Sequence, residues 1–158
     1  AIHFPGDAQL RPDRYTAELA RIVREAGGVI EEGVGVLGFE RGRNGIEAVQ
    51  TTEGKRSGAR VLLAMGAWSS GFADNLGLAI PVQPGKGYSI TYDRPATVPR
   101  RPLVLKERSV CVTTWADGFR LGSTMEFSGF DDSLNPRRLG ALERGAGEYL
   151  LEPAGPAK

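Results

Sequence analysis

Three glycines in the first half of the chain have the spacing by which a backbone can approach a pyrophosphate. Gly33, Gly35 and Gly38 form the pattern G-x-G-x-x-G, which in dinucleotide-binding proteins opens a helix whose amides receive the phosphate charge. Here the residues after Gly38 read FERGRNGIEAV, a strand pattern that runs into an Asn-Gly turn. We therefore interpret the three glycines as part of a twisted strand and reject a phosphate loop.

Few other side chains could do acid–base or metal chemistry. His3 is the single histidine and Cys111 the single cysteine, which excludes a disulfide framework and leaves too few soft ligands for a structural zinc site. A Ser-His-Asp or Cys-His arrangement would have to use His3, close to the start of the chain. The sequence thus disfavours a hydrolase and predicts no metal site.

The bulk composition limits the class of protein further. The chain has 158 residues, 41% of them hydrophobic, which suits a single domain with one core. Lysine and arginine total 20 against 19 acidic residues, for a formal net charge of +1, so bulk electrostatics do not favour nucleic acid. The sequence has no apolar run long enough to span a bilayer and no signal-peptide pattern, so we expect a soluble, cytoplasmic protein.

An amphipathic helix is predicted from Pro12 onward. Its apolar residues fall on one helical face, and a Gly-Gly pair then gives a stop signal. These apolar residues are Tyr15, Leu19, Ile22, Val23 and Ala26. After the helix, residues 34–41 and 46–54 read as strands joined by a turn at Asn44 and Gly45.

A buried strand and a short helix are expected next. Residues 61–65 are apolar without alternation, which is typical of a strand covered on both faces. Trp68, Phe72 and Leu76 recur at every fourth residue, which predicts a short helix closed by Gly77.

The second half reads as an antiparallel meander followed by a helix. Its strand patterns are separated by a proline-broken loop and a tight turn, and they span 86–93, 103–107, 109–115 and 119–127. Asn135 as cap and Pro136 at the first helical position open the helix, and residues 152–158 look like a frayed end. The predicted fold class is α+β, with a mixed sheet region followed by an antiparallel one.

Four segments in this order carry a resemblance to a known family. They read RPDRYTAELARIVREAGGVIEEGVGVLGFER, GIEAVQTTEGKRSGARVLLAMGAWS, LGLAIPVQPGKGYSITYD and DGFRLGSTMEFSGFDD. Together they resemble the FAD-dependent oxidoreductases of the D-amino acid oxidase superfamily, and most of all the small subunit of bacterial D-amino acid dehydrogenase. The resemblance extends to about Leu151, and its specific parts are LLAMGAWS, PVQPGKGYSIT and RLGSTMEFSGFD.

The resemblance implies FAD as cofactor and assigns residues to it. Val36 would contact the adenine through its main chain, and Ala64, Met65, Gly66 and Trp68 would lie along the flavin nucleotide. A helix that begins near Trp68 would direct free amides toward the cofactor, and Gly66 would let the chain approach without a Cβ. From the residues alone, a turn glycine at Gly66 and a core anchor at Trp68 are the simpler interpretation.

The resemblance also implies a substrate side. Lys86, Gly87 and Tyr88 would stand at the entrance of an amine pocket, where Tyr88 offers a rigid ring with one hydroxyl. From the residues alone, the alternation of Tyr88, Ile90 and Tyr92 is explained as one face of a half-buried strand.

The implied reaction is hydride transfer from the α-carbon of an amine to the flavin, after which the imine is hydrolysed to a keto acid. The catalytic residues stay unknown, because the cofactor carries the chemistry. The family's arginine anchor for the substrate carboxylate lies beyond the final helix, and Arg120 is the nearest candidate here, although a surface strand position explains it more simply. Cys111 lies near where relatives place substrate-facing side chains, although an isolated cysteine is usually a small buried hydrophobe.

The family's own G-x-G-x-x-G lies upstream of everything in this chain, which also begins with Ala rather than Met. The expected organisation is a partial FAD-binding segment at 1–80, an antiparallel substrate-binding sheet at 81–134, and a helix with a frayed end at 135–158. We therefore expect a central fragment that binds FAD poorly, is inactive alone, and self-associates through an exposed sheet edge.

Two other interpretations stay open at this point. The alternative function is a non-catalytic module that binds a small carboxylate or a protein on its antiparallel sheet. In the full-length enzyme a peripheral position at the inner membrane is compatible with the resemblance. The sequence does not distinguish an oxidase from a dehydrogenase, and it leaves the substrate amine open.

Overall fold

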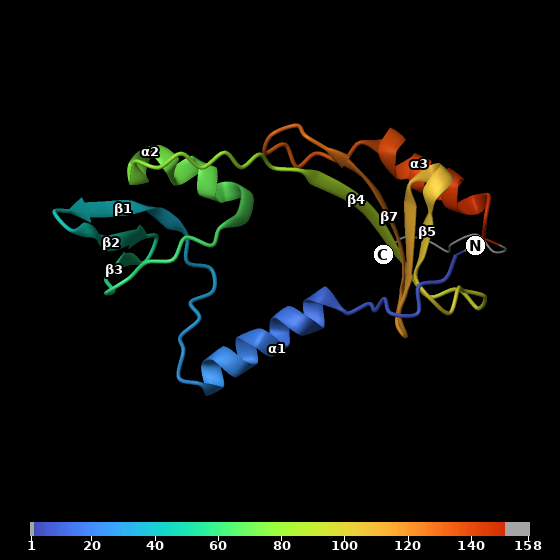
Figure 1. The fold of residues 1–158 in the computed structure, drawn as a ribbon, viewed down its shortest axis with the longest axis horizontal. Coiled ribbons are helices and arrows are strands. Elements are labelled where there is room, and N and C mark those ends of the chain that lie inside the picture. The colour runs from blue at the N-terminus through green and yellow to red at the C-terminus, as the bar shows by residue number, and fades with distance from the viewer. Residues whose placement is uncertain (1, 151–158) are drawn as a thin grey trace. The chain divides into compact units, whose positions relative to one another are not determined.

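The computed structural model describes residues 2–150, which form two compact units that divide between Pro81 and Val82 (Figure 1). Helices and antiparallel strands occur in the same chain, so the α+β class is confirmed. Among the helices of residues 2–150, none has the length and apolar character needed to cross a membrane.

The first unit begins with the predicted amphipathic helix, α1 (Pro12–Glu25). Pro12 at its first turn fits a position where the missing amide costs nothing, and the chain leaves the helix through Gly27, whose φ is +85°. No residue of α1 is buried, and its apolar side chains stay about half exposed. The apolar face is thus formed as predicted but is not covered by residues 2–150.

A three-stranded antiparallel sheet follows, in the order β1-β2-β3. Its strands are β1 (Val36–Gly42), β2 (Gly45–Thr51) and β3 (Gly54–Arg56). Gly38 lies inside β1, where the register shifts between Val36 and Gly38. The interpretation of the glycine pattern as an irregular strand is therefore confirmed, and no helix begins behind it.

The buried strand predicted at 61–65 is wrong. These residues have no regular secondary structure, and Leu62 is 89% exposed. A strand needs a hydrogen-bonded neighbour for its amides and carbonyls, and no strand within residues 2–150 pairs with this segment. The expected mixed sheet is therefore absent from the described residues, and both sheets are antiparallel.

The predicted short helix is confirmed, in two pieces. A 3₁₀ helix, η1 (Gly66–Phe72), runs directly into α2 (Ala73–Leu76). Gly77 closes it with a left-handed φ of +64°, as a C-terminal glycine commonly does. Phe72 packs edge-on against Phe39 of β1, with ring centroids 5.5 Å apart, so the helix is fixed to the sheet.

The second unit is a four-stranded antiparallel sheet in the order β4-β7-β6-β5. Its strands are β4 (Lys86–Tyr92), β5 (Leu103–Leu105), β6 (Val110–Thr114) and β7 (Phe119–Glu126), with a 3₁₀ turn η2 (Lys106–Arg108) between β5 and β6. Only the last three strands form the predicted meander. Instead of pairing with the next strand along the chain, β4 pairs with β7.

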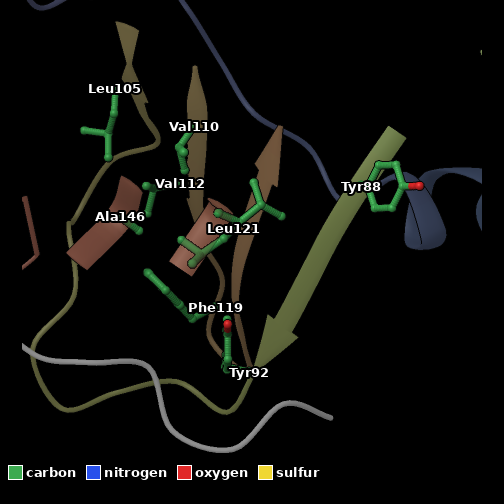
Figure 2. Close-up of a cluster of buried hydrophobic side chains, with 9 residues drawn as sticks. Tyr88, Tyr92, Leu105, Val110, Val112, Phe119, Leu121 and Ala146 are labelled. Atoms are coloured by element: carbon green, nitrogen blue, oxygen red, sulfur yellow. The ribbon is translucent and has the colours of Figure 1, made fainter. Parts of the chain in front are cut away.

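The helix α3 (Pro136–Gly147) packs on one face of this sheet and closes the core (Figure 2). Asn135 caps it as predicted, because its side chain accepts a hydrogen bond from the Arg137 amide. The largest fully buried side chains are Tyr92, Phe119, Leu121, Leu142, Val110 and Val112. The frayed end predicted at 152–158 lies outside the described residues.

Candidate functional site

Val36, predicted to contact an adenine, is the first residue of β1. It is half-buried and lies opposite Thr51, just where the β1–β2 register is irregular. The preceding residue forms two hydrogen bonds with Thr52, which directly follows β2: the Gly35 amide donates to Oγ1 of Thr52 at 3.0 Å, and the Thr52 amide donates to the Gly35 carbonyl at 2.9 Å. The main chain at Val36 is therefore firmly placed.

The turn at Gly66 is open to an approaching group. Gly66 has a φ of +55°, and a Cβ added there would meet nothing within 4 Å. The helix begins at Gly66 rather than near Trp68, because the Trp68 amide already donates to the Met65 carbonyl at 3.1 Å. Trp68 is 65% exposed, so the alternative that made it a core anchor is wrong.

The elements that carry Val36 and Gly66 belong to one packed unit. Besides the ring contact between Phe39 and Phe72, the Phe39 amide donates to Oδ1 of Asn75 at 2.9 Å. This bond satisfies an amide of β1 that would otherwise lack a protein partner at the sheet edge. The sequence had no signal for Asn75, because its partner lies 36 residues away along the chain.

The residues around this turn fit a flavin nucleotide. Gly66 leaves room for close approach of a ligand to the backbone, and Trp68 offers an exposed aromatic surface. Ala64 is also exposed, whereas Met65 is half-buried. The assignment of Ala64, Met65, Gly66 and Trp68 to the cofactor stays a prediction.

The three residues predicted to stand at a substrate pocket lie on opposite faces of β4. Tyr88 is buried with the core and Lys86 lies over its ring, with Nζ 5.6 Å from the centroid. Gly87 is exposed, on the opposite face. A ligand on the face opposite α3 would therefore meet the backbone of Gly87. Lys86 and Tyr88 take part in a network on the α3 side.

That network centres on Glu126, which the sequence reasoning did not single out. Its Oε2 accepts a hydrogen bond from the Tyr88 hydroxyl at 2.7 Å and forms an ion pair with Arg138, whose Nε lies 3.0 Å away. Lys86 Nζ lies 3.9 Å from the same carboxylate and donates to the Ser133 carbonyl at 2.7 Å. The end of β7, the start of β4 and the beginning of α3 are thereby tied together.

The charges of this network reinforce one another. The Tyr88 hydroxyl, followed by the positive charges of Lys86 and Arg138, holds the pKa of Glu126 below its usual value. Partial burial opposes the charge of Lys86, but Tyr88, Asp131 and Glu126 outweigh it, so the pKa of Lys86 is raised. Both groups therefore stay charged over a wider pH range than in water.

The face of the second sheet opposite α3 is open. One cross-strand row on this face runs through Ser89, Gly122, Cys111 and Val104, which are direct partners on β4, β7, β6 and β5. Cys111 is exposed, so the expectation of a small buried hydrophobe is wrong. The side chains of this row are small, so they leave space on this face.

Comparisons with known proteins identify a family for this chain. The family model "FAD dependent oxidoreductase" matches residues 1–157. A D-amino acid dehydrogenase 1 of Mesorhizobium japonicum is 33% identical over 151 residues, or 94% of this chain. A D-amino acid dehydrogenase of Xanthobacter autotrophicus is 32% identical over 157 residues, or 98% of this chain. The chain spans 36% and 37% of the lengths of these two relatives.

Solved structures show the same fold. A glycine oxidase from Geobacillus kaustophilus has a TM-score of 0.81 at 24% identity, over 90% of this chain and 38% of that one. An L-proline dehydrogenase from P. horikoshii has a TM-score of 0.74 at 20% identity, over 87% of this chain and 38% of that one. The family match extends over nearly every residue, and on that ground the chain belongs to the FAD dependent oxidoreductase family.

Proposed function

We propose that this chain is part of a flavin-dependent oxidoreductase that oxidatively deaminates D-amino acids or similar small amines. The observation that carries the proposal is that the family match runs through both units, and so includes the Gly66 turn and the open sheet face. The relatives named D-amino acid dehydrogenase favour D-amino acids as substrates. The alternative, a non-catalytic binding module, has no comparable support.

Bound FAD would supply the acceptor for a hydride from the α-carbon of the amine, and the resulting imine would be hydrolysed by water to a keto acid and ammonia. The protein's part is to bind and orient. Val36 contributes its main chain beside the adenine, while Ala64, Met65 and Gly66 leave the backbone accessible along the nucleotide. Trp68 adds an exposed ring to the same surface.

On the substrate side, the open face of the second sheet borders the amine. Gly87 contributes a surface without a side chain, and Lys86 and Tyr88 support it from behind through their contacts with Glu126. Because successive residues of a strand face opposite sides of the sheet, only Gly87 borders the pocket directly. Lys86 and Tyr88 act on the pocket through the other face.

The isolated chain is expected to be inactive. Within residues 2–150 the G-x-G-x-x-G glycines lie in and before a strand, so they offer no helix to a pyrophosphate. Titration of the purified chain with FAD, followed by flavin fluorescence, should give no tight binding, and D-alanine should not reduce an added dye. A yellow protein that oxidises D-alanine would contradict this.

A chimera tests the function itself. Residues 1–157 would replace the matching segment of the Mesorhizobium japonicum D-amino acid dehydrogenase, and we expect a flavin-containing protein that oxidises a D-amino acid. Gly66→Ala should remove flavin from the chimera. Gly27→Ala is the matched control, because both glycines have left-handed φ values, +55° and +85°, and a Cβ added at either would meet nothing within 4 Å.

Two outcomes would overturn the proposal. One is a folded chimera without flavin. The other is equal flavin content in the Gly66→Ala and Gly27→Ala chimeras, which would mean that Gly66 serves the turn alone. The quantity measured for Gly66→Ala is the amount of flavin per folded protein. A small loss of stability therefore does not affect the comparison.

Self-association of the isolated chain is part of the same proposal. Leu62 is 89% exposed and the apolar face of α1 is uncovered by residues 2–150, while β4 and β5 are the edge strands of their sheet. Exposed apolar surface and unpaired edges favour association. Sedimentation over a range of concentrations should show oligomers, and a monomer at high concentration would contradict this.

A further inference from the structure

A bulge in β7 exchanges the faces on which the side chains of this strand lie. Tyr88 of β4 lies opposite Ser123 of β7, whereas the preceding residue, Gly87, lies opposite Met125. Thr124 is therefore an extra residue of β7, without a partner on β4. Because side chains alternate along a strand, one extra residue exchanges the two faces for the rest of β7.

This exchange decides where Glu126 points. In an unbroken ladder Glu126 would lie on the face opposite α3. In the structure it lies on the α3 side, where its Oε2 accepts a hydrogen bond from the Tyr88 hydroxyl at 2.7 Å and lies 3.0 Å from Nε of Arg138. Lys86, its cross-strand partner, has Nζ 3.9 Å from the same carboxylate. The bulge and the network around Glu126 therefore depend on each other.

The backbone of the bulge is strained at Thr124. Its φ is +44°, in the left-handed region that glycine adopts readily and that a β-branched residue avoids. The side chain of Thr124 is exposed, so its own burial does not compensate for the strain. A conformation of this kind persists where the surrounding contacts hold it. The hydrogen bond between Tyr88 and Glu126 is placed to do so, because it joins β4 to β7 across Thr124.

We infer that Tyr88 and Glu126 are positioning residues, whose hydrogen bond holds the strained bulge at Thr124 and so fixes the backbone of Gly87 beside the amine. This inference rests on the proposed function, in which Gly87 borders the amine. With threonine in the bulge, the position of Gly87 depends on the bond between Tyr88 and Glu126. With glycine in the bulge, the same backbone is free of strain and needs that bond less.

The test uses the D-amino acid dehydrogenase chimera. Tyr88→Phe should raise KM for the D-amino acid by about fivefold and change kcat by less than about twofold, because a looser pocket weakens binding before it affects the chemistry. Peptides from residues 86–92 should exchange their amide hydrogens about tenfold faster, as measured by mass spectrometry. Glu126→Gln weakens the same hydrogen bond from the other side and should act in the same direction.

A second substitution separates positioning from general stability. Thr124→Gly, added to Tyr88→Phe, should return both KM and amide exchange toward the values of the unmodified chimera, because it removes the strain that the bond opposes. Ser109→Gly is the matched control. Ser109 also has a left-handed φ, +51°, but it lies between η2 and β6, outside the pairing of β4 with β7. It should relieve similar strain without rescuing Tyr88→Phe.

Three results would overturn the inference. These are unchanged KM in both Tyr88→Phe and Glu126→Gln, unchanged exchange of residues 86–92 in both variants, and rescue by Ser109→Gly that equals or exceeds rescue by Thr124→Gly. The exchange measurement needs no turnover. A chimera that holds flavin but oxidises no amine would therefore refute the proposed function, while exchange would still decide whether Tyr88 and Glu126 hold the bulge.

Discussion

The hydroxyl of Tyr88 donates a 2.7 Å hydrogen bond to Glu126, from the first half of β4 to the last residue of β7. The bond spans an irregularity in the pairing of the two strands, where the register shifts between Gly87 and Tyr88 and Thr124 takes a φ of +44°. A bulge of this kind loosens the ladder locally. The hydrogen bond between Tyr88 and Glu126 joins β4 to β7 at this irregularity, and so holds the backbone next to Gly87 in place.

The first prediction concerns acid unfolding. The pKa of Glu126 is lower in the folded chain than its usual value, so the folded state binds this proton less readily than the unfolded state does. The stability from Glu126 is therefore present above about pH 4 and is lost as pH falls through the folded pKa. Glu126→Gln should reduce the acid-dependent loss of unfolding free energy, measured by urea denaturation at several pH values.

The control for this prediction is Glu107→Gln, which removes an exposed carboxylate from η2. Its acid profile should follow that of the unmodified chain. If Glu126→Gln and the unmodified chain lose stability with the same slope, the network does not contribute as described. Tyr88→Phe should lie between the two, because it removes the hydroxyl while Lys86 and Arg138 remain.

A second prediction concerns alkaline pH. Burial and the hydrogen bond to Glu143, 2.9 Å long, raise the pKa of Tyr92. Its stabilising contribution is present below the usual tyrosine pKa of about 10 and is lost as pH rises toward the folded value. In an ultraviolet titration Tyr92 should ionise last, together with unfolding. Tyr92→Phe should lack that final step, whereas Tyr149→Phe, at a side chain 46% exposed, should retain it.

The predictable parts of the fold are those that local chemistry decides. Asn135 and Pro136 start α3, Gly77 ends the short helix, and the Asn44-Gly45 turn joins β1 to β2, all as the sequence indicated. Each of these signals acts on amides or dihedral angles within a few residues. The resemblance added the family, which no local signal could provide.

The parts that escaped prediction depend on distant partners. Apolar composition at 61–65 suggested a buried strand, but a strand requires a neighbour, and none is present among residues 2–150. The pairing of β4 with β7, and the roles of Glu126 and Asn75, depend on contacts 27 or more residues apart in sequence. The face on which Lys86, Gly87 and Tyr88 each lie followed only once this pairing was known.

A third prediction concerns Gly122 of β7. A Cβ at this position would meet atoms only at 4.0 Å, and its φ is not left-handed. Gly122→Ala should therefore leave stability unchanged or raise it by up to about 1 kcal/mol, because alanine restricts the unfolded chain. Thermal unfolding measures the change, and a clear loss of stability would contradict the open space beside Gly122.

A fourth prediction concerns the bond between Asn75 and the Phe39 amide, which joins the helix after Gly66 to β1 at 2.9 Å. Asn75→Ala removes the acceptor and leaves a partly buried amide unsatisfied, which should cost about 1–3 kcal/mol of unfolding free energy in the first unit. Asn75→Asp keeps an oxygen acceptor at the same place and should restore most of the loss. Asp74→Ala, at the neighbouring exposed position, should have little effect. Hydrogen exchange at Phe39 gives the direct measurement: exchange should accelerate in Asn75→Ala alone, and unchanged exchange would show that the ring contact between Phe39 and Phe72 suffices to hold the helix on β1.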